Sequence, residues 1–128
     1  MWYNNLAKSE LLEHIYDDVP ELNDACIHSI DIVGNENKIS IMFEMPSLPR
    51  KMPTKWEKGN CNTILCQLDF WDIEYCTFQV NRMFGKSDIM IEYDEVLKVK
   101  IKGNFNVNFQ AQCGMIQKVN AYKKQIDV

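Results

Sequence analysis

From residue 21 onward, apolar side chains recur at every second position in one segment after another. Ile39, Ile41, Phe43 and Met45 form one such series, and residues 105–111 form another, with asparagine and glutamine at the alternate positions. A period of two is typical of β-strands, in which successive side chains point to opposite faces of the sheet. The clean alternation predicts a sheet with one buried face and one face in water.

Turn-forming residues divide these segments into strands. Glycine and asparagine at residues 34–37, and Gly103-Asn104 further on, tolerate the positive φ angles of tight turns. The connections are short and contain no helical pattern, which predicts a meandering, mostly antiparallel sheet. The expected strands span residues 26–33, 38–45, 62–70, 74–80, 89–93, 97–101 and 105–111.

Two segments do not follow this pattern. Residues 46–60 contain three prolines and four basic residues, which predicts a long loop because proline cannot donate a backbone hydrogen bond. Residues 115–126 fit both a helical stripe and a last edge strand. The strand is the favoured interpretation because it would complete the sheet.

The N-terminal segment carries a helical pattern. Leu11, Leu12, Ile15 and Tyr16 recur at three- and four-residue spacing after the potential N-cap Ser9. The helix should end before the proline at residue 20. Three earlier apolar residues should anchor it on the sheet: Trp2, Tyr3 and Leu6. The expected fold is therefore α+β, with one N-terminal helix packed on a mostly antiparallel, meandering β-sheet, in a single domain of residues 1–128.

Length and composition fit one ordinary globular domain. The chain has 128 residues, of which 46% are hydrophobic and 25% charged. No apolar run approaches the ~20 residues that a membrane-spanning helix needs. The first residues lack the basic and apolar regions of a secretory signal, so we expect a cytoplasmic protein.

The cysteines and histidines give no sign of a metal site. The five cysteines are odd in number and contain no Cys-x-x-Cys pair, and the two histidines are not spaced as a ligand pair. We therefore expect reduced cysteines that pack as small hydrophobic residues, with no metal and no cofactor.

Catalytic motifs are also missing from the sequence. Phosphate-binding glycine loops, nucleophile elbows and zinc-protease helices are not found. Asp24 and His28 are the only pair suited to acid–base chemistry. We expect structural roles for both: Asp24 accepts backbone hydrogen bonds in a turn, and His28 is a core residue that shares a strand face with Cys26, Ile30 and Ile32. No catalytic residue is assigned, and the protein is not expected to be an enzyme.

The charge distribution favours a basic protein partner. The net charge is −4 and the pI about 5.1, which disfavours direct binding to nucleic acid. Acidic residues are concentrated in the middle of the chain, where they could form a partner-binding surface. Trp56, in the proline-rich loop, is either a lid over the sheet or a further anchor for a partner. The candidate partner-binding residues are Asp72, Glu74, Asp88, Glu92, Asp94, Glu95 and Trp56.

The chain resembles the immunity protein 50 family, a group of partners of polymorphic bacterial toxins. The resemblance rests on the turn-to-strand segment Asn-Asp-Ala-Cys-Ile-His-Ser-Ile at residues 23–30, the Pro-x-x-Trp loop at residues 53–56, and a late strand tyrosine, Tyr122. It implies a small cytoplasmic antitoxin that binds a cognate toxin domain, such as a nuclease, and blocks it stoichiometrically without chemistry.

An alternative function remains open on the residues alone. The chain could be a small-ligand-binding protein or a stand-alone enzyme that uses a pocket between the helix and the sheet, near Asp24 and His28. A deep polar pocket around His28 would favour this alternative. The sequence does not indicate the oligomeric state or the identity of the toxin.

Overall fold

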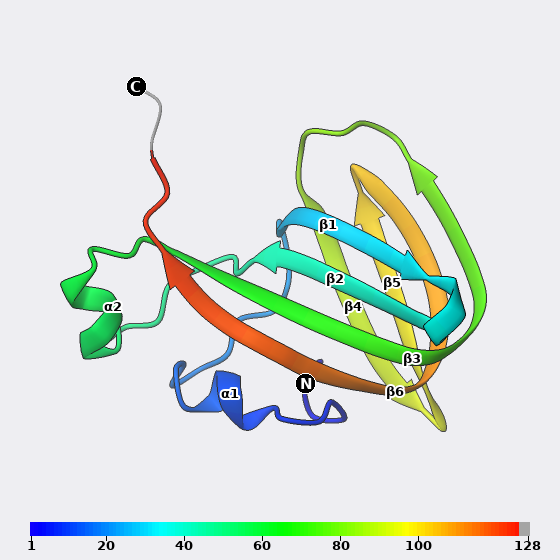
Figure 1. Ribbon diagram of the computed structural model, residues 1–128, viewed down its shortest axis with the longest axis horizontal. Coiled ribbons are helices and arrows are strands. Elements are labelled where there is room, and N and C mark those ends of the chain that lie inside the picture. The colour runs from blue at the N-terminus through cyan, green and yellow to red at the C-terminus, as the bar shows by residue number, and fades with distance from the viewer. Residues whose placement is uncertain (126–128) are drawn as a thin grey trace.

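A computed structural model of the chain, which describes residues 1–125, is dominated by one six-stranded antiparallel sheet (Figure 1). The strand order is β1-β2-β3-β6-β5-β4, and each neighbouring pair is antiparallel. The strands are β1 (Cys26–Val33), β2 (Lys38–Glu44), β3 (Thr63–Val80), β4 (Ser87–Asp94), β5 (Val96–Gly103) and β6 (Phe105–Tyr122).

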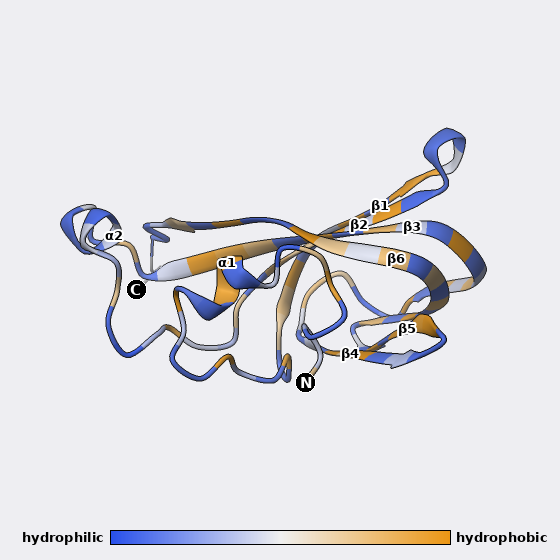
Figure 2. Cartoon of the chain, turned by 90° about the horizontal axis from the view of Figure 1, so that it is seen from below, coloured by the Kyte–Doolittle hydropathy of each residue, from blue (hydrophilic) through white to orange (hydrophobic). Residues whose placement is uncertain are grey.

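The two central strands are long enough to bend. β3 and β6 each contain 18 residues, and Asp72 and Tyr75 of β3 adopt positive φ angles of 56° and 55°. Their pairing shifts register between Glu74 and Thr77. Such irregularities increase the local twist of a sheet. The sheet curls at this point, so that β4 and β5 lie on the same side as the N-terminal segment (Figure 2).

The curled sheet almost closes on itself. Ala25, just before β1, exchanges two backbone hydrogen bonds with Ser87 at the start of β4, with N···O distances of 2.8 and 3.0 Å. Next to this contact, Ile89 N–H donates to the carbonyl of Leu22 at 2.8 Å. The segment before β1 is therefore linked to the start of β4 over a short stretch, and beyond Ile89 the outer edge of β4 makes no backbone hydrogen bond to another part of residues 1–125.

The core lies inside this curl. The inward residues of β2 and β3, which include Ile41, Phe43, Leu68 and Phe70, are fully buried. The predicted anchors Trp2, Tyr3 and Leu6 are 4–6% exposed and cover the core from below, which confirms their assignment. The Trp2 indole N–H donates to the carbonyl of Pro20 at 3.0 Å, and this bond holds the N-terminal segment in place.

The expected α+β fold with a packed N-terminal helix is wrong. Strands make up 54% of the chain and helices 10%. The predicted helix shrinks to one turn, α1 (Glu10–Glu13), and Ser9 makes no capping bond with its side chain. Lys8 has a positive φ of 61°, and Ala7 already forms a bridge with Met115 of β6. Helices this short gain little from backbone bonds. Burial of Leu12 and Tyr16 is sufficient to place the segment without a regular helix.

Of the other local predictions, some are confirmed and others differ from the structure. The strand interpretation of residues 115–122 is confirmed, because these residues complete β6, whereas Ile126 lies outside the described residues. The two strands expected at residues 62–70 and 74–80 form one continuous strand. The loop expected at residues 46–60 contains a short helix, α2 (Thr54–Lys58). A 3₁₀ turn (Gly34–Glu36) joins β1 to β2, as the glycine and asparagine residues predicted.

Within residues 1–125, none of the helices has the length and apolar character needed to cross a membrane.

Candidate functional site

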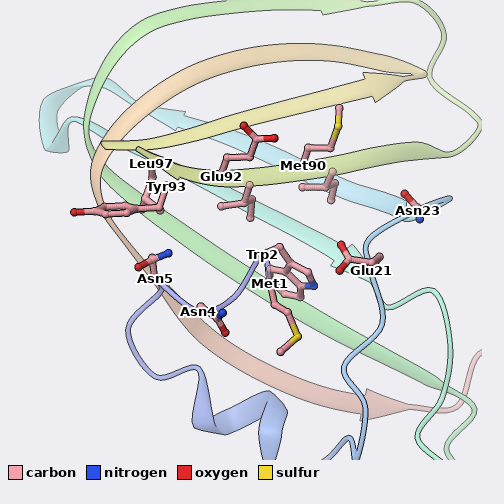
Figure 3. A pocket seen from close by; sticks show the side chains of 12 residues that line it. Met1, Trp2, Asn4, Asn5, Glu21, Asn23, Met90, Glu92, Tyr93 and Leu97 are labelled. Atoms are coloured by element: carbon pink, nitrogen blue, oxygen red, sulfur yellow. The ribbon is translucent and has the colours of Figure 1, made fainter. Parts of the chain in front are cut away.

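Strand β4 separates two cavities at the free edge of the sheet. One, of about 560 Å³, lies between this edge and the N-terminal segment and is lined by Glu21 and Tyr93, among others. Figure 3 shows Met1, Trp2, Asn4 and Asn5 on one side of β4, while the side chains of Met90 and Glu92 point away from them to the other side. The second, of about 420 Å³, lies on the outer face of β4, β5 and β6, beside Tyr75. Met90 and Glu92 line both cavities, so β4 forms a ridge between two hollows.

The outer edge of β4 has free hydrogen-bonding groups. Ser87 and Ile89 direct their backbone bonds outward, to Ala25 and Leu22. Backbone direction alternates along an antiparallel strand, so Ile91 and Tyr93 direct their N–H and C=O groups to the same side. No backbone or side-chain group of residues 1–125 bonds to them there. Free edges of this kind can accept a further strand from another chain.

The acidic residues of β4 lie opposite lysines. Asp88 pairs in register with Lys102, and Glu92 pairs with Lys98. Lys98 also forms an ion pair with Asp94, with an N···O distance of 3.5 Å. The expected acidic surface is therefore a ladder of mixed charge on the β4–β5 hairpin. The sequence did not reveal this arrangement because it depends on the cross-strand register.

Large apolar side chains are exposed in the same part of the chain. Within residues 1–125, seven of the ten exposed large hydrophobic residues fall between residues 75 and 93. Phe84, in the connection before β4, is 89% exposed and Tyr75 is 76% exposed. Aromatic and methionine side chains are enriched at protein interfaces. These residues were not selected from the sequence, although their clustering among acidic residues is visible there. The seven are Tyr75, Phe78, Val80, Met83, Phe84, Met90 and Tyr93.

The remaining predicted residues are distributed over two regions. Asp72 and Glu74 lie at the bend of β3, and Glu95 lies in the β4–β5 turn with a positive φ of 64°. Trp56 lies on α2, at the opposite end of the molecule (Figure 1). Its indole is half-buried and packs against the core, as expected for a lid. A role for Trp56 in partner binding stays a prediction.

His28 is not a core residue. The register of β1 with β2 shifts here, so that Ile27 faces Phe43 and Ser29 faces Met42, while His28 has no partner. Ile27 and Ile30 consequently share the core-facing side, which strict alternation would not allow. The His28 side chain is 34% exposed. This register shift is a β-bulge. Because of it, the predicted burial of His28 and the predicted faces of β1 are both wrong.

His28 lies beside Cys26 and Glu44 at the start of β1. Its Nε2 is 3.6 Å from Glu44 Oε2. The Glu44 carboxylate is nearly buried, and its Oε1 accepts hydrogen bonds from Tyr122 Oη at 3.0 Å and Lys124 Nζ at 3.1 Å. The Cys26 thiol also hydrogen-bonds this carboxylate. Glu44 is thus the centre of a polar cluster that joins β1, β2 and the end of β6.

The cluster shifts the pKa values of its members. Burial opposes ionisation of Glu44, but hydrogen bonds from Cys26, Lys124 and Tyr122 outweigh it and lower the pKa of this carboxyl below its usual value. Burial and the neighbouring Glu44 carboxylate raise the pKa of the Cys26 thiol. Glu44 is therefore held as a carboxylate and Cys26 as a thiol.

The pocket expected near Asp24 and His28 takes a different form. A cavity of about 310 Å³ is lined by Asp24, Cys26, Glu44 and Lys124, but not by His28. No helix contributes to its lining. Asp24 is exposed, has a positive φ of 56°, and its backbone N–H donates to the Asp88 carboxylate at 2.9 Å. The hydrogen bond at Asp24 therefore uses its backbone N–H as the donor and a carboxylate of β4 as the acceptor.

The fold and the surface around β4 define a small β-sheet protein whose exposed edge and side chains are suited to contact with another protein. The model of the family described as immunity protein 50 matches residues 8–122. The chain belongs to this family. No curated protein and no solved structure matches it.

Proposed function

We propose that this protein is a cytoplasmic immunity protein that binds a cognate toxin domain one to one and blocks it without catalysing a reaction. Membership of the immunity protein 50 family is the observation that carries this proposal. The arrangement of β4, with a free edge, two adjoining cavities and exposed apolar residues, supports a protein partner.

The proposed contact surface, called the β4 surface here, comprises the second half of β3, the connection to β4, and the β4–β5 hairpin. Exposed aromatic and methionine side chains such as Phe84 and Tyr93 would be its anchors, since a few buried apolar groups dominate most interfaces. Its acidic residues would surround them and favour a basic partner surface, as nucleases have. These acidic residues are Asp72, Glu74, Asp88, Glu92, Asp94 and Glu95.

The mixed charge of the hairpin limits what the acidic residues contribute. Lys98 partly neutralises Glu92 and Asp94, so the surface does not present a strong negative field. Exposed ion pairs between a lysine and a carboxylate contribute about 1 kcal/mol or less to stability. The carboxylates should therefore accelerate encounter with a basic toxin, while the apolar anchors supply most of the affinity.

Co-expression with a toxin domain encoded next to this gene tests the proposal. The immunity protein should restore growth of cells that produce the toxin and should be recovered with it in a pull-down. Phe84→Ala combined with Tyr93→Ala should weaken both effects. The matched control is Ile32→Ala with Leu48→Ala, since both residues are exposed apolar residues outside the β4 surface. Failure of the wild-type protein to bind or to protect would contradict the proposed function.

A further inference from the structure

The cluster at the start of β1 has the composition of a metal site. Cys26, His28 and Glu44 each offer one ligand atom, and these atoms all lie within 4.8 Å of one another. A thiolate, an imidazole and a carboxylate together are typical of zinc coordination. Zinc bonds of about 2.0–2.3 Å in tetrahedral geometry separate ligand atoms by roughly 3.3–3.8 Å. The 3.6 Å between His28 Nε2 and Glu44 Oε2 already matches this separation.

The fold brings these three residues together in two ways. Strand pairing places Cys26 directly opposite Glu44. The β-bulge leaves His28 without a partner on β2, and its imidazole reaches the same carboxylate. Sequence spacing gave no indication of this set, because Glu44 lies on the next strand and the bulge cannot be read from residue types.

The two oxygens of Glu44 have different surroundings. Oε1 accepts hydrogen bonds from Tyr122 and Lys124, whereas Oε2 faces His28 and lies at a longer distance of 3.3 Å from Lys124 Nζ. Oε2 can therefore bind a metal while Oε1 keeps its bond to Tyr122. Hydrogen bonds that orient a ligand in this way are typical of metal centres.

We propose that Cys26 Sγ, a His28 ring nitrogen and Glu44 Oε2 bind one Zn²⁺ ion, with the remaining position open to water or to a side chain of a partner. Binding releases the Cys26 thiol proton to solvent, since the thiolate is the ligand form. The adjoining 310 Å³ cavity gives access to the site. This inference is independent of toxin binding.

Lys124 provides a distinctive test of the site. Its ammonium lies beside Glu44, and its side chain is 54% exposed, so it can turn away into solvent when a cation binds. A positive charge this close to the site should lower the affinity of the protein for Zn²⁺. Replacement by glutamine, Lys124→Gln, should therefore increase zinc affinity by about fivefold or more. A role of Lys124 in folding alone would not produce this increase.

The experiment titrates the reduced full-length protein with Zn²⁺ against a competing chelator, and with Co²⁺ while the absorption spectrum is recorded. We expect one ion per chain and a thiolate-to-cobalt charge-transfer band. Cys26→Ser should abolish the band and weaken zinc binding by at least ~10-fold, as should Glu44→Gln. The control Cys113→Ser changes an exposed cysteine outside the cluster. It should leave the charge-transfer band and the zinc affinity unchanged.

Cys26 is only partly buried, so Cys26→Ser keeps the test valid even if Glu44→Gln fails to fold. Zinc binding that is equal in the wild type and in Cys26→Ser, a cobalt spectrum without the thiolate band, or no zinc binding at all would overturn the proposal. Unchanged or weaker binding by Lys124→Gln would contradict the proposed coordination by Glu44.

Discussion

Gly114 of β6 lies directly against the ring of Phe70 of β3. A Cβ atom at position 114 would be 2.8 Å from Phe70 Cδ1 and 2.8 Å from Cδ2 of Leu6. Phe70 is fully buried and packs edge-on to Phe109, with 5.3 Å between ring centroids. The absence of a side chain at Gly114 thus allows the N-terminal segment and the aromatic core to approach the same point of β6.

We expect Gly114→Ala to lower the free energy of unfolding by about 1–3 kcal/mol, because the added methyl group overpacks a filled core. Urea denaturation would measure this loss. Gly34→Ala is the matched control, since a Cβ atom there would meet nothing within 4 Å. A variant at position 114 as stable as the wild type would show that the core adapts without cost.

A second prediction concerns the polar face of the sheet. Ser40 Oγ donates a 2.6 Å hydrogen bond to Asp69 Oδ1, and Asp69 is only 3% exposed. Ser40→Ala should reduce stability by about 1–3 kcal/mol, because a buried carboxylate oxygen loses a donor. Ser29→Ala should change stability by less than about 0.5 kcal/mol, since Ser29 is only partly buried. Equal losses for the two variants would contradict this account.

Glu44 should make stability depend on pH under acidic conditions. Its pKa is lowered in the folded protein, so folding favours the carboxylate. The resulting stability is fully present above the unfolded value of about 4.5 and is lost as pH falls through the lower folded pKa. Unfolding of the wild type and of Glu44→Gln between pH 7 and pH 3 should show a smaller acid-dependent loss in the variant.

The matched control for this pH series is Glu57→Gln, at an exposed position on α2. Its stability should decrease with acidification in parallel with the wild type. If Glu44→Gln also followed the wild-type curve over the whole range, the hydrogen bonds around Glu44 would not stabilise its charged form.

Local alternation was enough to predict most strands. The inward residues Ile39, Ile41 and Phe43 are buried as their period of two indicated, because each strand buries one face of an antiparallel sheet. The prediction of an N-terminal helix was wrong because local spacing does not reveal long-range contacts. Its apolar spacing was real, but the backbone of Ala7 bonds to β6, and this long-range contact prevails over local helical preference.

The candidate sites depended on information that residue spacing does not contain. A one-residue bulge at His28 placed Ile27 on the core side together with Ile30 and left the imidazole of His28 out of the core. The cross-strand register placed Lys98 opposite Glu92 and turned an expected acidic patch into a mixed one. The segment between residues 72 and 95 carries both the acidic and the exposed apolar residues, and its role in partner binding stays a prediction.

The most direct test of the account is the association rate constant with the cognate toxin domain, measured by stopped-flow mixing at low and high ionic strength. Glu92→Lys combined with Asp94→Lys should slow association by about 10-fold at low salt, with a smaller difference at high salt. Arg50→Glu with Lys51→Glu, remote from β4, should not slow association. Circular dichroism should first establish that both variants are folded. If the β4 variant bound the toxin as fast and as tightly as the wild type at low ionic strength, the proposed role of the β4 surface would be contradicted.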